Sequence, residues 1–148
     1  MDRQEAATLL DDLRRACAAE YEDPDDARAT ALMDSTQELV DRLAPGGWDI
    51  ERLARPTTAL VDHLVPLRMG EGVDDAAERT LLDELTRLRE EVGGAADVDP
   101  FLVAMLADLI QEAWGQTSNP RWYAGEQREQ TIRSFAAVSE AAVAVVSD

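Results

Sequence analysis

The sequence predicts an all-α protein, a single compact bundle of five or six helices joined by short turns that are marked by proline and glycine. Apolar residues recur at steps of three and four along nearly the whole chain, which is the period of an amphipathic helix. An N-cap residue followed by proline, the pattern that opens a helix, occurs three times, at Asp23–Pro24, Asp99–Pro100 and Asn119–Pro120.

The first two predicted helices are separated by the first of these cap patterns. Asp23 followed by Pro24 predicts the start of the second helix, which runs to about Leu43. The Pro-Gly-Gly run at residues 45–47 predicts its end. The first helix covers residues 4–21 and has one apolar stripe, formed by Ala6, Leu9, Leu10, Leu13, Cys17 and Tyr21.

The third helix is predicted from its prolines. After a short turn near Ile50 and Leu53, Pro56 is expected to open the helix, because proline fits the first helical turn. Pro66 is expected to end or kink it at Val65, because an internal proline removes a backbone hydrogen bond and clashes with the preceding turn. The helix is expected to carry the apolar residues Leu60, Val61 and Leu64.

The fourth helix is predicted to begin at Asp74 and to end at the glycines of residues 93–94. Its outer face places Asp83 four residues before Arg87, and Arg87 four residues before Glu91. Pairs at this spacing are typical of a solvated helix surface. The apolar positions expected to face inwards are Ala77, Leu81, Leu85, Leu88 and Val92.

The fifth helix, from Phe101 to about Gly115, is apolar around most of its circumference, which predicts a central and buried position. Its polar stripe consists of Asp108, Gln111 and Glu112. Because an unpaired buried charge is costly, this stripe must reach solvent along a narrow edge, meet an arginine of another helix, or line a polar cleft. The sequence leaves these three alternatives open.

The last helix is predicted to follow Asn119 and Pro120 and to extend to about Val146. Residues 141–146 are also compatible with a short strand, because they are rich in valine. No linker or repeat divides the chain, so residues 1–148 are expected to form a single all-helical domain.

Composition limits the classes of function. The 148 residues include 31 Asp and Glu against 14 basic residues, all of them Arg, and the net charge is -17. Direct nucleic-acid binding is disfavoured, because affinity for phosphate needs clustered cations. No apolar run approaches the roughly 20 residues of a membrane helix, and no signal-peptide pattern is found, so no membrane association is expected. The lone Cys17 fits a reducing compartment, and we expect a cytoplasmic protein.

The acidity itself has two interpretations. An Asp- and Glu-rich chain without Lys is typical of a GC-rich genome or of a salty cytoplasm, in which case the charge belongs to the whole proteome. Alternatively, the surface is built to meet a cationic partner, because a large negative field steers basic proteins towards it.

Titratable residues give little indication of catalysis. His63 has no nucleophile or orienting carboxylate at a suitable spacing, and it is expected to be an ordinary surface or boundary residue. Acids three residues apart, as in Glu38 with Asp41 and Glu126 with Glu129, could gather Mg²⁺ from one helix face, but such pairs are common in so acidic a chain. We therefore assign no catalytic residue, no metal ligand and no cofactor.

Aromatic residues are the better candidates for binding. Trp48 lies in a Gly- and Pro-rich turn, while Trp114, Arg121, Trp122 and Tyr123 flank the loop around residues 118–120. Trp, Tyr and Arg often anchor interfaces, because they bury large areas and keep a polar group. These five residues either form a recognition edge or cover the open ends of the bundle.

The sequence favours a non-enzymatic protein-interaction module, such as an adaptor, inhibitor, immunity protein or antitoxin-like protein, whose acidic face binds a basic partner protein. One alternative is a helical small-molecule-binding or regulatory module, with a cavity lined by Trp114 and Trp122 and with Arg121 at its mouth. A second alternative is a carboxylate-metal hydrolase, which would need acids from at least two helices to converge. The oligomeric state and the identity of the partner do not follow from the sequence.

Overall fold

Helices account for most of the chain that the computed structural model describes, namely residues 1–46, 50–117 and 123–147. No strand occurs in these residues, so the predicted all-α bundle is confirmed. Within them, no helix is long and apolar enough to cross a lipid bilayer. The helices are α1 (Arg3–Glu22), α2 (Asp26–Leu43), α3 (Ile50–Arg68), α4 (Asp75–Val92), α5 (Pro100–Thr117) and α6 (Gly125–Val146).

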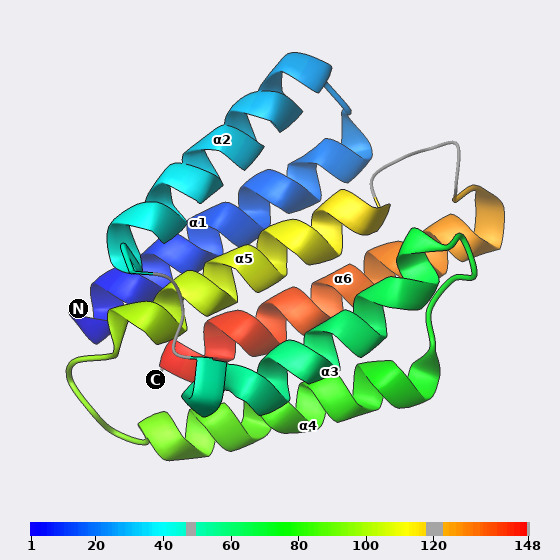
Figure 1. The fold of residues 1–148 in the computed structure, drawn as a ribbon. Coiled ribbons are helices and arrows are strands. Elements are labelled where there is room, and N and C mark those ends of the chain that lie inside the picture. Colours follow the sequence, from blue (N-terminus) through cyan, green and yellow to red (C-terminus); the bar gives the residue numbers. More distant parts are fainter. Residues whose placement is uncertain (47–49, 118–122, 148) are drawn as a thin grey trace.

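The central helix of the bundle is α5, as its apolar circumference predicted (Figure 1). It packs against α1, α2, α3 and α6, and α4 completes the bundle by packing on α3 and α6. Eleven of the 18 residues of α5 are buried. Among the described residues, α2 and α3 do not contact each other, so the uncovered side of α5 lies between these two helices.

One apolar core joins all six helices, with Leu10, Val40, Leu64, Leu85, Leu106 and Val138 among its members. Burial of apolar surface stabilises the fold by about 25 cal/mol per Å². Cys17 of α1 lies in this core as a free and fully buried thiol. Burial, and secondarily the charge of Glu20, raises the pKa of Cys17 to about 12.

The prediction that Pro56 opens α3 was wrong, and the helix does not end at Pro66. The helix begins at Ile50, ahead of Pro56, and continues through Pro66 to Arg68. Each internal proline costs about 3 kcal/mol. Burial of a leucine side chain contributes about 1.5–3 kcal/mol, so the core-facing leucines of α3 together exceed the cost of the two prolines. These buried leucines are Leu53, Leu60, Leu64 and Leu67.

Two of the predicted helix starts are confirmed. The carboxylate of Asp74 accepts a hydrogen bond from the backbone N–H of Ala77 at 3.0 Å, and α4 follows it. The carboxylate of Asp99 accepts one from the backbone N–H of Phe101 at 2.9 Å, and α5 begins at Pro100. Each bond satisfies a backbone donor that a helix start otherwise leaves unpaired.

The last helix differs from its prediction at the start. The predicted cap pair Asn119–Pro120 lies outside the described residues, and α6 begins at Gly125. The alternative of a strand at residues 141–146 was wrong, because this segment is the end of α6. Ala142, Val145 and Val146 are buried there, and a helix brings all three onto the core-facing side.

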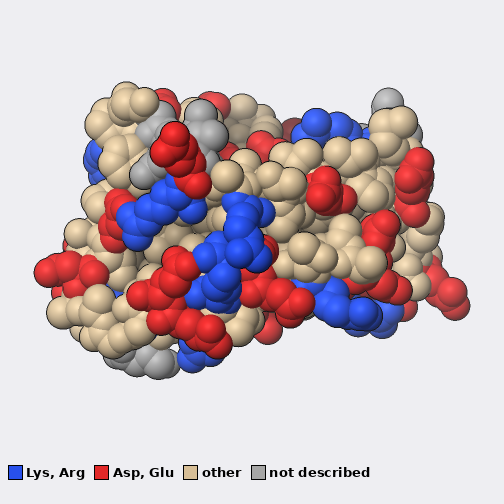
Figure 2. All heavy atoms as spheres, turned by 60° about the horizontal axis from the view of Figure 1, so that its bottom comes forward, with Lys and Arg blue, Asp and Glu red and all other residues tan. Residues whose placement is uncertain are grey.

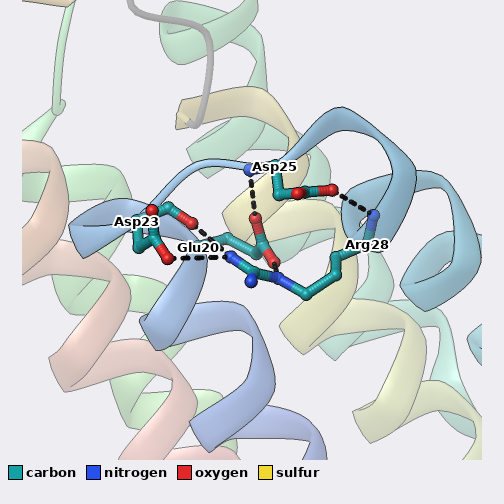
Figure 3. Close-up of polar contacts among 4 residues, drawn as sticks. All are labelled: Glu20, Asp23, Asp25 and Arg28. Carbon is teal, nitrogen blue, oxygen red and sulfur yellow. Dashed lines mark hydrogen bonds and ion pairs between the residues drawn. The ribbon is translucent and has the colours of Figure 1, made fainter.

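A buried carboxylate fixes the turn between α1 and α2 (Figure 3). The side chain of Glu20 lies between the two helices, where one oxygen accepts from Nε of Arg28 at 2.9 Å and the other from the backbone N–H of Asp25 at 3.0 Å. The sequence predicted Asp23 as the cap of α2, but Asp25 caps it by accepting from the backbone N–H of Arg28 at 2.9 Å. The backbone N–H of Asp23 still bonds to Ala19 at the end of α1, which explains the shift.

Glu20→Gln should destabilise the protein at neutral pH. The hydrogen bond from Arg28, followed by that from the Asp25 backbone, lowers the pKa of Glu20. The ionised side chain of Glu20 therefore stabilises the folded protein at pH values above its unfolded pKa of about 4.3. This contribution is lost as the pH falls through the pKa of Glu20 in the folded protein. Urea unfolding of both proteins between neutral and acidic pH should therefore show a difference that shrinks below about pH 4.3. Glu22→Gln, at an exposed acid two residues on, is the control, and equal effects of the two variants would contradict this role of Glu20.

A single arginine joins the ends of three helices. Arg3, the first residue of α1, donates from Nε to the carbonyl of Val146 at 2.9 Å and from Nη2 to the carbonyl of Ser147 at 2.9 Å. Its Nη1 donates to the carbonyls of Ala95, at 3.2 Å, and of Gly93. The carbonyls of Gly93 and Val146 lie where α4 and α6 end, and such helix ends favour a cation.

Candidate functional site

The five residues predicted to bind a partner, four aromatic residues and one arginine, fall into two groups. Trp48, Arg121 and Trp122 lie outside the described residues, so their binding role stays a prediction, as does the cavity proposed beside Trp122. Trp114 and Tyr123 are described, and both are buried in the core rather than exposed at an edge.

Tyr123 ties two connections of the bundle together. Its hydroxyl donates to the carbonyl of Leu67 at 2.7 Å and accepts from the backbone N–H of Gly72 at 3.2 Å. The first contact is at the end of α3, and the second is in the turn that leads to α4. Burial raises the pKa of Tyr123. In the free protein, this side chain therefore holds the turn after α3 against the segment before α6.

His63 is buried, which corrects the expectation of a surface or boundary position. The reason is that α3 packs against both α4 and α5, so its buried arc is wider than that of a helix at the edge of a bundle. Burial lowers the pKa of His63, although the charges of Glu78 and Asp74 act in the opposite direction. Its Nδ1 has no hydrogen-bond partner among the described residues.

The acid pairs considered as metal ligands are exposed on separate helices. Glu38 and Asp41 lie on α2, whereas Glu126 and Glu129 lie on α6. Across the described part of the chain, no group of three His, Cys, Asp or Glu side chains is arranged so that it could hold a metal ion.

A polar stripe marks the uncovered side of α5. We call it the α5 stripe, and its members, all partly exposed, are Asp108, Gln111, Glu112 and Gln116. Glu112 accepts a hydrogen bond from the side-chain amide of Gln116 at 3.3 Å. Of the three alternatives that the sequence left open, the stripe follows the first, because it reaches solvent between α2 and α3.

The α5 stripe runs alongside α3. At the start of both helices, Arg52 forms an ion pair with Asp99. At their ends, Nε of Arg68 donates to the side-chain oxygen of Gln116 at 3.4 Å. The two helices are therefore parallel, and a residue of α3 is level with the residue of α5 that is numbered 47 or 48 higher.

Asp108 and Glu112, both partly exposed, have no basic partner among the described residues, whereas the two acids that are buried do. Glu20 pairs with Arg28, and Glu84 accepts from Arg55 at 2.7 Å and from Arg87 at 2.9 Å. Figure 2 shows the face formed by α3 and α4, where acidic and basic side chains lie side by side. Burial, and then the negative charge of Glu112, raises the pKa of Asp108 to about 6.

Exposed apolar residues border the α5 stripe. Val61 and Val65 on the outer face of α3, and Met69 directly after the end of that helix, follow one another at four-residue steps and are 51%, 46% and 66% exposed. We call these three residues the apolar row. By the parallel alignment of the helices, Val61 is level with Asp108 and Val65 with Glu112. Within the described residues, the large hydrophobic side chains that are exposed are Met33 of α2, Val61 and Val65 of α3, and Met69 directly after α3.

Of the three apolar residues that the sequence assigns to this helix, Leu60 and Leu64 are buried, whereas Val61 is 51% exposed. A helical step of about 100° separates Val61 from Leu60, so the two cannot share the centre of one face. The four-residue spacing of Val61, Val65 and Met69 was the signal that could have revealed a second apolar face on α3.

Comparisons with protein-family models, curated proteins and solved structures found no match to this chain. The function of the α5 stripe and of the apolar row is therefore inferred from their own chemistry.

Asp108→Asn should stabilise the free protein at alkaline pH. The pKa of Asp108 is about 6 in the folded protein and about 3.9 in the unfolded chain. Ionisation of Asp108 therefore costs the folded protein nothing below the unfolded pKa, and it destabilises the protein as the pH rises through 6. Allowing for partial exposure, we expect the variant to gain about 1–2 kcal/mol at about pH 8 and nothing at about pH 4. Denaturant unfolding at both values measures this, with the exposed Asp34→Asn of α2 as control. A loss of stability at alkaline pH would show that Asp108 is paired.

Proposed function

We propose that the protein is a non-enzymatic interaction module, an adaptor, inhibitor, immunity or antitoxin-like protein, which binds a basic partner protein through the side of α5 that faces solvent between α2 and α3. The observation that carries the proposal is the half-buried carboxylate of Asp108, which no arginine of its own chain neutralises within the described residues. An Arg or Lys of the partner would pair with Asp108 and with Glu112 one turn further along.

Proteome-wide acidity explains exposed acids but not this pair. A genome or a salty cytoplasm that favours Asp and Glu adds them at solvated positions, where an extra charge costs little. Asp108 and Glu112 instead lie on the most apolar helix, where burial and mutual repulsion oppose ionisation of Asp108. A cation brought by a partner would remove both penalties, and the net charge of -17 would accelerate the encounter.

The test is affinity capture of the tagged protein from lysate of its source, at physiological and at high salt, with identification of the captured proteins. We expect a basic protein that is retained at physiological salt, is lost at high salt, and is lost by Asp108→Asn/Glu112→Gln. The control is Asp34→Asn/Glu38→Gln, which changes the same charges at the same spacing on the exposed surface of α2. Absence of a basic protein, or equal capture by the two double variants, would refute the proposal.

A further inference from the structure

The apolar row gives α3 a second apolar face. Leu60, Leu64 and Leu67 cover the inner face, whereas Val61 and Val65 are about half exposed on the outer face, and the more exposed Met69 continues their row just beyond the helix. The row extends over eight residue steps, from Val61 to Met69, or about 12 Å at 1.5 Å per step. A partner helix matches this length with two turns, because its residues i, i+4 and i+8 repeat at the same distance.

The charges around the row decide the kind of partner. Asp62 and Glu71 are exposed on its outer side and beyond its end, and Asp108 and Glu112 of the α5 stripe lie on its other side. Among the described residues, Arg68 is the basic residue at the end of the row, and Arg55, near Asp62, is already paired with Glu84, so acids predominate beside the row. In a dimer, a second copy of this chain would place these acids close to the same acids of the other copy, and each copy has a net charge of -17. A basic partner would not meet this repulsion.

We propose that the apolar row is the docking site for a basic amphipathic helix of the partner protein. The apolar residues of that helix lie along Val61, Val65 and Met69, and its Arg or Lys side chains reach Asp108 and Glu112 on the side of α5. Rows at four-residue spacing are the ridges by which helices pack against each other. This inference rests on the proposed function for the identity of the partner as a basic protein.

The first experiment measures binding of three synthetic 18-residue peptides by fluorescence anisotropy. One peptide has leucines at three- and four-residue steps and arginines elsewhere, one has glutamates in place of the arginines, and one is a scrambled form of the first. We expect the wild-type protein to bind the first peptide at least tenfold more tightly than either of the others, and less tightly as salt rises. Equal binding of the arginine peptide and its scrambled form would overturn the proposal, because charge alone would then suffice.

The second experiment assigns the binding to the apolar row. Val61→Ser/Val65→Ser keeps the net charge and lies at exposed positions, so the variant should fold as the wild type does, which a thermal melt checks. Its affinity for the arginine peptide should fall at least tenfold, whereas Met33→Ser, at the exposed methionine of α2, should bind as the wild type does. Equal affinity of the wild type and the double serine variant would overturn the row as the docking site.

The same variants separate this inference from the proposed function. A captured basic protein that the double serine variant retains in full would refute docking on the row and leave the proposed function intact. Peptide binding that depends on the row, without any basic protein in the lysate, would refute the proposed function alone. Sedimentation of the free chain gives a further check, because a dimer that dissociates on Val61→Ser/Val65→Ser would show that a second copy covers the row and would overturn the proposal.

Discussion

Arg3→Met should lower the free energy of unfolding by about 2–4 kcal/mol. The substitution removes a cation that donates to the carbonyls of Gly93, Ala95, Val146 and Ser147, where α4 and α6 end against α1. Hydrogen bonds to a charged group contribute about 1.5–3 kcal/mol each, and part of this value is recovered when water reaches the partly exposed carbonyls. Urea unfolding followed by circular dichroism measures the change.

Two further variants show whether geometry or charge is responsible. Arg3→Lys keeps the charge but loses the planar fork that reaches several carbonyls at once, so its stability should lie between those of the wild type and Arg3→Met. Arg133→Met, at an exposed arginine of α6, changes the net charge by the same amount and should shift stability by less than about 0.5 kcal/mol. Equal losses for Arg3→Met and Arg133→Met would mean that net charge, not the junction of helix ends, is responsible.

Trp114→Ala should have a still larger effect, a loss of about 3–5 kcal/mol. Trp114 is 2% exposed on the central helix, and its removal would leave a large cavity among the residues that α5 packs against. Against a total stability of about 5–15 kcal/mol for a domain of ordinary stability, such a loss brings the protein close to unfolding at ambient temperature. A thermal melt with near-ultraviolet circular dichroism would detect it.

Trp114→Phe is the matched control. The indole Nε1 is buried without a hydrogen-bond partner among the described residues, so its replacement removes an unpaired donor together with part of the ring. We expect a loss of about 1–2 kcal/mol, well below that of the alanine variant. A stable Trp114→Ala protein with impaired partner capture would instead support the interface role that the sequence suggested for this residue.

The helices were predictable from the sequence because burial imposes the helical period on their apolar residues. Leu81, Leu85 and Leu88 of α4 illustrate this, since all three are buried as their spacing predicted. Local rules failed where tertiary packing outweighed them. Pro56 and Pro66 lie within α3 because several leucines anchor the surrounding helix in the core, and no rule about proline alone includes that contribution.

Part of the polar structure could not be predicted, because contacts between helices influence which of several nearby acids an arginine meets. The sequence paired Arg87 with Asp83 and Glu91, but the structure pairs it with Glu84 and Glu91, and Glu84 also meets Arg55 of α3. A helix wheel cannot show that α3 approaches that side of α4. The α5 stripe was visible in the sequence as an interruption of an apolar helix, but its position between α2 and α3 required the packing of all six helices.

The buried thiol of Cys17 can report on transient opening of the helical bundle. The thiolate is the form that attacks an alkylating reagent, and a thiol with a pKa of about 12 and no exposure is protected twice, by protonation and by the side chains around it. Since the chain has one cysteine, each modification event records an excursion that separates α1 from the rest of the core. The rate of Cys17 alkylation, followed by mass spectrometry, would therefore measure how often the bundle opens, without any added probe. A ligand that binds only the folded bundle would slow this reaction.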